Sequence, residues 1–163
     1  MLVYRASRRT RAAFDPLDSS ASVARDGWRF NDKRSEILYT AEVQSLSILE
    51  VAARPGWDTV TELTIAAIEV LDGTVLDLSD LGIVLPSNWN VRPAAPNAQG
   101  IGGEFLAAVE RAAAAGRQVC GVRAPSVIGT TDYNVLLDPR QKTNFSVASW
   151  SRIPFNWLVG TAT

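Results

Sequence analysis

The sequence contains no histidine and one cysteine, Cys120. A disulfide bond within the chain, a zinc-finger site and a histidine-based catalytic triad all need residues that are missing here. A general acid or base must therefore be a carboxylate, a tyrosine or Cys120. A metal site would need oxygen ligands, and because no Asp-rich loop supplies them we expect no metal.

The chain also lacks an excess of either charge. Its 16 basic and 17 acidic residues leave a net charge of −1, which argues against a nucleic acid as the main ligand. Lysine is rare, since only Lys33 and Lys142 accompany the many arginines. Arginine suits planar recognition of phosphates or carboxylates, although a bias in genome composition would produce the same ratio.

Long hydrophobic runs are absent as well. The first residues, MLVYRASRRTRAAF, lack the apolar segment of a signal peptide, and no apolar run approaches the length that spans a membrane. We therefore expect a cytoplasmic protein. The 163 residues, of which 47% are hydrophobic and 20% charged, favour a single globular domain with a substantial core.

The pattern of apolar residues predicts several short strands and two helices, and thus a compact α+β domain with mostly antiparallel strands. Asp72-Gly73 is a typical two-residue hairpin turn. The helices are expected over residues 41–54, before Pro55-Gly56, and 97–116. The strands are expected over residues 2–4, 37–40, 64–70, 75–78, 119–122, 134–137 and 145–148.

The first predicted helix carries a glutamate among apolar residues. At 3.6 residues per turn Glu50 falls within the stripe formed by Val43, Leu46, Leu49 and Ala53. Glutamate is seldom buried without a partner. Two interpretations stay open: a boundary residue that reaches solvent or pairs with a structural arginine, or a carboxylate at the floor of a cleft.

The second predicted helix begins with a glycine-rich segment, Gln99–Gly103. No Gly-Lys-Ser/Thr follows, and Phe105 stands where a dinucleotide-binding pattern needs its third glycine. We therefore expect the glycines to serve close helix packing, and Gly116 to end the helix. Its apolar face should consist of Ile101, Phe105, Ala108, Val109 and Ala112.

Two loops contain further polar residues. Arg8, Arg9 and Arg11 form a basic cluster typical of a solvated loop, whereas Arg5, at the end of the first strand, is better placed to point inward. Residues 81–96 form a long connection in which residues 87–90 are expected to be exposed.

Several short motifs occur together in a distinctive order: Val3-Tyr4-Arg5, Gly27-Trp28-Arg29-Phe30-Asn31, Leu38-Tyr39-Thr40-Ala41, Leu49-Glu50, Gln99 with Ile101-Gly102, Pro125-Ser126, and Asn134-Val135-Leu136 before Asp138-Pro139. In this order they resemble the RES-domain toxins of bacterial toxin-antitoxin operons. That family is named after an arginine, a glutamate and a serine, which correspond here to Arg29, Glu50 and Ser126.

The resemblance implies a fold like that of ADP-ribosyltransferases and a reaction that consumes NAD+ without a metal. Glu50 would stabilise the transition state, and Tyr39 would stack on the nicotinamide ring. Arg5 and Arg29 would contact the phosphates or the nicotinamide ribose. Ser126 would bond the substrate or orient Glu50, and Asn134 is a further expected NAD+-binding residue.

Structural roles remain as alternatives for these residues. Tyr39 would also suit a core position, Ser126 a turn, and the arginines an ion-pair network with Glu50 or Glu104. With such roles the chain would be a nucleotide-binding or interaction domain without catalysis.

The resemblance further implies a helix-turn-helix antitoxin of the Xre type, which would supply any contact to DNA. The acceptor of ADP-ribose stays open between water, phosphate and a protein. Ile48 stands two residues before Glu50, where transferases that modify proteins often have a second acid, although Glu104 or Asp132 would offer a carboxylate from elsewhere.

Overall fold

A computed structural model of the chain describes residues 1–9, 11–24, 26–53, 60–129 and 131–154. They form a mixed seven-stranded sheet in the order β4-β5-β6-β2-β1-β3-β7, with helices α1 (Gln44–Ala52) and α2 (Pro96–Ala114). The strands are β1 (Leu2–Ser7), β2 (Leu38–Ala41), β3 (Glu62–Val70), β4 (Val75–Asp77), β5 (Gly121–Pro125), β6 (Tyr133–Leu137) and β7 (Phe145–Pro154). Among the strand pairs of these residues only β4–β5 is parallel, so the predicted α+β class with mostly antiparallel strands is confirmed.

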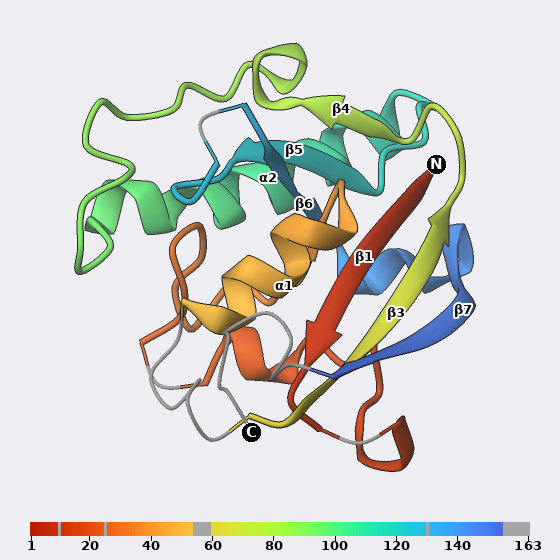
Figure 1. Ribbon diagram of the computed structural model, residues 1–163. Coiled ribbons are helices and arrows are strands. Elements are labelled where there is room, and N and C mark those ends of the chain that lie inside the picture. The colour runs from red at the N-terminus through yellow and green to blue at the C-terminus, as the bar shows by residue number, and fades with distance from the viewer. Residues whose placement is uncertain (10, 25, 54–59, 130, 155–163) are drawn as a thin grey trace.

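The sheet consists of two groups of strands that meet between β1 and β2. These two strands share one paired position, Tyr4 with Ala41, whereas β1 and β3 pair along six positions. In Figure 1 the strands of the two groups run in clearly different directions. A cavity lies at this seam.

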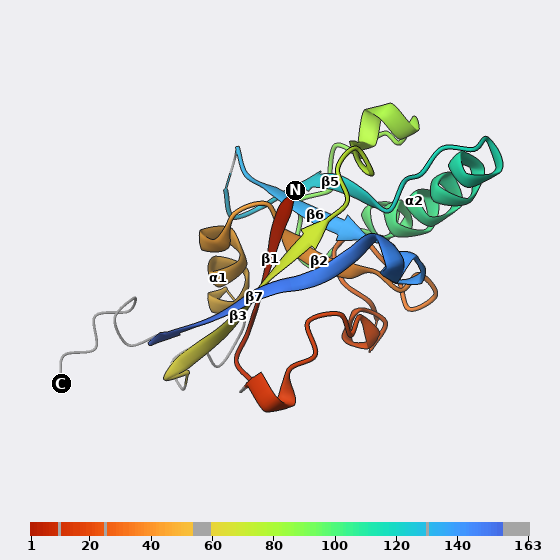
Figure 2. The ribbon, with the colours of Figure 1, turned by 90° about the vertical axis from the view of Figure 1, so that its right-hand side faces the viewer.

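Alternation along β6 distributes its side chains between two cores. Leu136 contacts the core beneath α2, while Val135 and Leu137 join Leu38 and Val3 in a core on the other side of the strand. Because successive side chains of a strand face opposite sides, one short apolar strand serves both cores. Figure 2 shows α1 and α2 at well separated places along the sheet.

The second helix follows its prediction closely. All five residues of the predicted apolar face are buried, and Gly116 follows the helix with φ of +71°. Gly102 donates its backbone N–H to the carbonyl of Phe30 at 2.6 Å, and a Cβ there would lie 2.6 Å from that oxygen. The expected role of these glycines in close packing is thus confirmed at Gly102. Across the described ranges, no helix combines the length and apolar character needed to cross a membrane.

The predicted apolar stripe of the first helix is wrong. Val43 is 42% exposed and Leu49 is 47% exposed, whereas Leu46, Ser47 and Val51 are buried. The helix begins only at Gln44, because Val43 is extended with φ of −124°, and one face packs on β1 and β2. Glu50 is half-buried at the edge of that face. The predicted end of the helix at Arg54 and the Pro55-Gly56 turn lie outside the described residues.

The predicted hairpin at Asp72-Gly73 is also wrong. The chain does turn there, with Gly73 at φ of +76°, but β4 does not pair with β3. Both edges of β3 are occupied, by β1 and β7, so the chain continues to the far end of the sheet. There the carbonyl of Thr74 accepts hydrogen bonds from Cys120 and Gly121, and β4 pairs in parallel with β5.

Candidate active site

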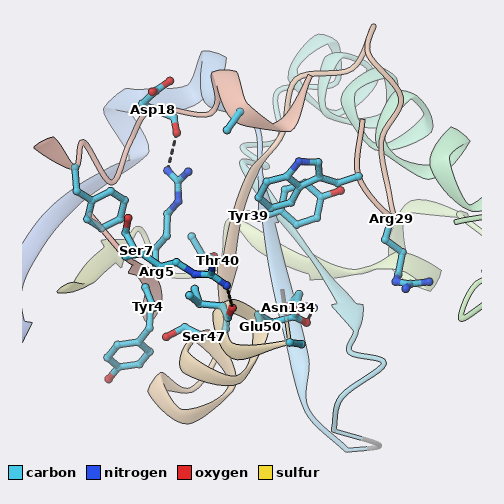
Figure 3. A pocket seen from close by; sticks show the side chains of 18 of the residues that line it. Tyr4, Arg5, Ser7, Asp18, Arg29, Tyr39, Thr40, Ser47, Glu50 and Asn134 are labelled. Carbon is cyan, nitrogen blue, oxygen red and sulfur yellow. Dashed lines mark hydrogen bonds between the residues drawn. The ribbon is translucent and has the colours of Figure 1, made fainter. Parts of the chain in front are cut away.

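A cavity of about 760 Å³ opens at the seam between β1 and β2. Its walls come from β1, the following loop, the segment 28–30, β2, α1 and single residues of distant segments, Arg92 and Asn134. Five of the six residues expected in the site line it: Arg5, Arg29, Tyr39, Glu50 and Asn134. Figure 3 shows Arg5 and Arg29 on opposite sides of the group formed by Tyr39, Glu50 and Asn134.

Glu50 is held by two side chains at one of its oxygens. Oε1 accepts a hydrogen bond from Ser126 Oγ at 3.1 Å and another from Asn134 Nδ2 at 3.0 Å. Within the described parts of the chain, Oε2 accepts no hydrogen bond. The carboxylate is therefore fixed in orientation, while one oxygen remains available at a cavity that Glu50 lines.

Ser126 does not line the cavity but contacts Glu50. Its side chain is buried, and its Oγ donates to Glu50 while accepting the backbone N–H of Ile128 at 3.1 Å. Its own N–H donates to the carbonyl of Asp132 at 3.0 Å, which closes the loop around it. Of the two roles expected for Ser126, orienting Glu50 has the necessary hydrogen bond.

Tyr39 presents its ring to the cavity while its hydroxyl is held inside the protein. The hydroxyl donates to Asn31 Oδ1 at 2.8 Å and accepts the N–H of Phe30 at 3.1 Å. Burial raises the pKa of Tyr39 well above its usual value, so the phenol stays neutral. Trp28 lies beside the ring, with 4.9 Å between ring centroids and 40° between planes. The two rings form an aromatic surface on the cavity wall.

The backbone of residues 27–31 is shaped by a tight turn. Gly27 has φ of +82°, and a Cβ there would approach the carbonyl oxygen of Asn31 to 2.2 Å, so only glycine fits. Trp28 donates its N–H to that same carbonyl at 2.9 Å. Asn31 is buried, and its two amide N–H groups are shared among three carbonyl oxygens, those of Ser22, Asp32 and Ser35, at 2.8 to 2.9 Å from Nδ2. This local structure explains why the Gly-Trp-Arg-Phe-Asn motif directs Trp28 and Arg29 to the cavity.

Arg29 combines a place in the cavity wall with two contacts to a distant loop. Its Nη1 donates to the carbonyl oxygens of Trp89 at 2.9 Å and Val91 at 3.0 Å. Burial is the main cause that lowers the pKa of this guanidinium, and the charge of Arg92 lowers it further, while Glu50 opposes the shift. Arg29 and Glu50 form no ion pair, so the ion-pair alternative does not apply to them.

Arg5 holds the loop that follows β1. Its Nη1 donates to the carbonyl oxygens of Pro16 at 2.8 Å and Asp18 at 2.7 Å, and its guanidinium lies 5.6 Å from the centre of the Phe14 ring. The inward orientation expected for Arg5 is confirmed, since it lines the cavity. Its expected contact with a phosphate stays a prediction.

Comparison with known proteins gives the same assignment as the motifs. The family model described as "RES domain" matches residues 2–157, which is almost the whole chain. The chain belongs to the RES domain family. A relative from Yersinia enterocolitica, named Toxin Res, is 30% identical over 118 residues, covering 72% of this chain and 71% of the relative. The family resemblance inferred from the sequence is therefore confirmed.

The basic cluster after β1 was expected to be a solvated loop, but it also forms part of the cavity wall. Arg8 and Arg9 are exposed as expected, but both line the cavity. Arg8 Nη2 also donates to the carbonyl of Val51 at 2.9 Å, next to Glu50 in the chain. Because Arg8 and Arg9 directly follow the strand that carries Arg5, their closeness to it in the sequence was the signal that could have indicated a shared wall.

Sequence reasoning also missed Arg92 and Ser47 as lining residues. Arg92 lies in the long connection between η4 (Leu78–Leu81) and α2, where no motif marks it. Part of that connection is more ordered than expected, since Trp89 is half-buried and stacks on Phe30 with 6.0 Å between ring centroids. The stacking of this half-buried ring on the buried Phe30 fixes the backbone that carries Arg92.

Cys120, Glu104 and Asp132 lie away from the cavity. Cys120 is buried, contacts Thr74 at 2.9 Å and has its pKa raised by burial, so it remains a thiol outside the cavity wall. Glu104 and Asp132 are not among the residues that line the cavity. Among the residues that the structure describes, the acids that line it are Asp15, Asp18 and Glu50. Within the described residues, no group of three or more Cys, Asp or Glu side chains is arranged to hold a metal ion.

Proposed function

We propose that this RES domain is the toxin of a toxin-antitoxin system and that it cleaves NAD+ between nicotinamide and ribose. The observation that carries the proposal is Glu50, fixed by Ser126 and Asn134 at Oε1 in the wall of a cavity that also contains Tyr39. The toxin role is supported by family membership and by the name of the Yersinia relative. A purely structural glutamate would not need both partners at one oxygen beside an open cavity.

In the proposed reaction the bond between ribose C1′ and the nicotinamide nitrogen breaks, and its electron pair leaves with nicotinamide. Positive charge then develops on the ribose ring, as in glycoside cleavage. The Glu50 carboxylate stabilises that charge, and its fixed orientation lowers the reorganisation that the reaction requires. An acceptor oxygen attacks C1′ and loses its proton, which completes ADP-ribosyl transfer.

The neighbouring residues bind and orient the substrate in this proposal. Tyr39 and Trp28 offer aromatic surface to the nicotinamide ring. Ser126 and Asn134 act as positioning residues for Glu50, although Asn134 also lines the cavity and can contact the ribose. Arginine side chains of the cavity wall, including Arg5 and Arg29, contact the phosphates.

For the acceptor we favour water or phosphate over a protein side chain. Ile48, two residues before Glu50, cannot activate an acceptor, and the other acids of the lining, Asp15 and Asp18, belong to the loop that Arg5 holds. Labelled NAD+ incubated with host lysate checks this preference. A single strongly labelled protein band with little free ADP-ribose or its phosphate ester would mean that protein transfer is the activity.

We further propose that the partner is a helix-turn-helix antitoxin of the Xre type and that the pair acts in the cytoplasm. An inhibitor has only to fill or cover the cavity at the β1–β2 seam. With a net charge of −1 the toxin itself would contribute little to DNA binding. Growth arrest on expression of the toxin alone, relieved by the adjacent antitoxin gene, is the expected result. Tight binding of operator DNA by the isolated toxin would contradict the division of roles.

The decisive experiment measures nicotinamide released from NAD+ by the purified protein and by Glu50→Gln. The amide keeps the shape of the side chain but lacks the charge, so we expect turnover to fall by about 10³-fold while binding of NAD+ remains. Asn134→Ala should lose less, about 10- to 100-fold, because Ser126 still holds Oε1. Near-parent turnover by a folded Glu50→Gln protein would exclude the assignment.

A further inference from the structure

Arg29 and Arg92 place two positive charges at the end of the cavity opposite Arg5. Arg29 bonds the carbonyl oxygen of Val91, the residue directly before Arg92, and both arginines line the cavity. The lining acids Asp15 and Asp18 belong to the loop held by Arg5, at the other end. Arg92 makes no hydrogen bond or ion pair with any residue that the structure describes. Within the described structure neither arginine forms an ion pair, although the charge of Glu50 acts on Arg29 from across the cavity wall.

The electrostatics of Arg29 agree with this geometry. Burial is the largest cause that lowers the pKa of Arg29, and the charge of Arg92 is the second. The two guanidinium groups are therefore near enough to repel one another. Two neighbouring cations at a partly enclosed surface are unfavourable by themselves. A bound anion with several oxygens would relieve the repulsion and accept hydrogen bonds from both forks.

The backbone that carries Arg92 is held from several directions. Trp89 stacks on Phe30, and Arg29 Nη1 bonds the carbonyl oxygens of Trp89 and Val91. Asn97, at the start of α2, donates to Asn88 Oδ1 at 3.0 Å. These contacts fix the backbone on both sides of Arg92 before a ligand arrives, which reduces the ordering cost of binding.

We propose that Arg92 and Arg29 form a site for a phosphate group at this end of the cavity. Two sources share that chemistry: the phosphates of NAD+ itself, and a separate inorganic phosphate bound beside it. The assignment to NAD+ rests on the proposed function, whereas the anion site itself does not. Arg92 is the ligand-binding residue, and Arg29 both positions the segment 89–92 and contributes its charge.

The test measures binding by calorimetry in the Glu50→Gln background, where turnover is suppressed. The probes are NAD+, sodium phosphate and nicotinamide riboside, which carries no phosphate. Arg92→Ala should weaken binding of NAD+ or of phosphate by about tenfold or more, because a charged hydrogen bond is lost, and should leave nicotinamide riboside unchanged. Arg92→Lys should lose less, since the charge remains without the fork. Arg111→Ala removes an exposed arginine of α2 outside the cavity and serves as the matched control.

Each outcome distinguishes the sources or overturns the site. If Arg92→Ala weakens the binding of NAD+ alone, the site belongs to the substrate phosphates. If it weakens the binding of inorganic phosphate alone, the site holds a separate anion. Parent-like binding of both probes by Arg92→Ala, equal weakening of nicotinamide riboside, or no binding of either anion by the Glu50→Gln parent would overturn the inference. If nicotinamide is never released but phosphate binding depends on Arg92, the anion site stands and the proposed reaction fails.

Discussion

The two ends of the cavity use the same residue type in different ways. At the β1 end, Arg5 bonds the carbonyl oxygens of Pro16 and Asp18, and the lining acids Asp15 and Asp18 lie on the loop that it holds. At the opposite end, Arg29 bonds backbone carbonyls as well, but the neighbouring charge is a second arginine, Arg92. Among the described residues, the first end has two acids beside its arginines Arg5, Arg8 and Arg9, whereas at the second end Glu50 is the carboxylate whose charge acts on Arg29.

This difference shows that counting arginines in a cavity wall does not identify its anion site. Arg5 and Arg29 would look equivalent in a list of lining residues, because each is half-buried and each donates Nη1 to two carbonyl oxygens. The two arginines differ in the charged residues around them, because Asp15 and Asp18 lie on the loop held by Arg5, whereas Arg92 lies near Arg29. We therefore expect Arg5 to serve mainly the folding of its loop and Arg29 to serve both folding and binding.

The largest effect that tests this comparison is expected from Arg29→Ala. It removes one of the two cations and also the bonds that hold Trp89 and Val91. We expect kcat/KM for NAD+ to fall by about 100-fold, with most of the change in KM, because each lost charge-assisted bond contributes roughly 1.5–3 kcal/mol. Steady-state kinetics with NAD+ measures both kcat/KM and KM. Arg29→Lys should recover only part of the loss, and full recovery would mean that the planar fork is unimportant.

A smaller and different effect is expected from Arg5→Ala. The carbonyl oxygens of Pro16 and Asp18 lose their donor, so the free energy of unfolding should fall by about 1–2 kcal/mol. The KM for NAD+ should rise by much less than in Arg29→Ala. Urea denaturation and steady-state kinetics on the same preparation measure both quantities. If Arg5→Ala raises KM as strongly as Arg29→Ala, the phosphates lie at the β1 end and the comparison is reversed.

The fold was predictable wherever a local pattern determined the structure. The face of α2, its end at Gly116 and the use of Gly102 for close packing all follow from spacing and from the missing side chain. The errors arose where contacts between strands that are distant in the sequence determine the structure. The hairpin at Asp72-Gly73 failed because β1 and β7 occupy both edges of β3, and no local signal reports that. The stripe of α1 failed because Val43 precedes the helix and because the face that packs on β1 and β2 carries Leu46, Ser47 and Val51 in place of Leu49.

The site divides in a similar way. Glu50, Tyr39 and Arg29 carry a family signature, so the sequence was sufficient to nominate them, and they line one cavity. The hydrogen bonds from Ser126 and Asn134 to the same oxygen of Glu50 depend on how the segments 126–134 and α1 meet in space. Arg92 had no signal at all, because its position follows from the packing of Trp89 on Phe30 in an irregular segment.

The smallest expected effect concerns Asp18 and the charge balance of the β1 end. Hydrogen bonds from Ser20 are the main cause that lowers the pKa of Asp18, with smaller contributions from the charges of Arg5 and Arg9. The Ser20 N–H donates to Asp18 Oδ1 at 2.9 Å.

Because the folded pKa lies below the unfolded value of about 3.9, the ionised carboxylate stabilises the fold above that pH, and the contribution disappears as the pH falls through the folded pKa. Asp18→Asn should therefore lower the free energy of unfolding at pH 7 by only a few tenths of a kcal/mol, since Asp18 is exposed and solvent screens its charge.

Urea denaturation of both proteins at pH 7 and near pH 3 measures the difference, which should shrink on acidification. Added salt should reduce the part due to Arg5 and Arg9 but largely spare the part due to Ser20, because hydrogen bonds are screened less than separated charges. A difference that grows toward low pH would mean that the carboxylate is disfavoured in the fold. The acids of the β1 end would then not offset its arginines, which would compete with Arg29 and Arg92 for the phosphate.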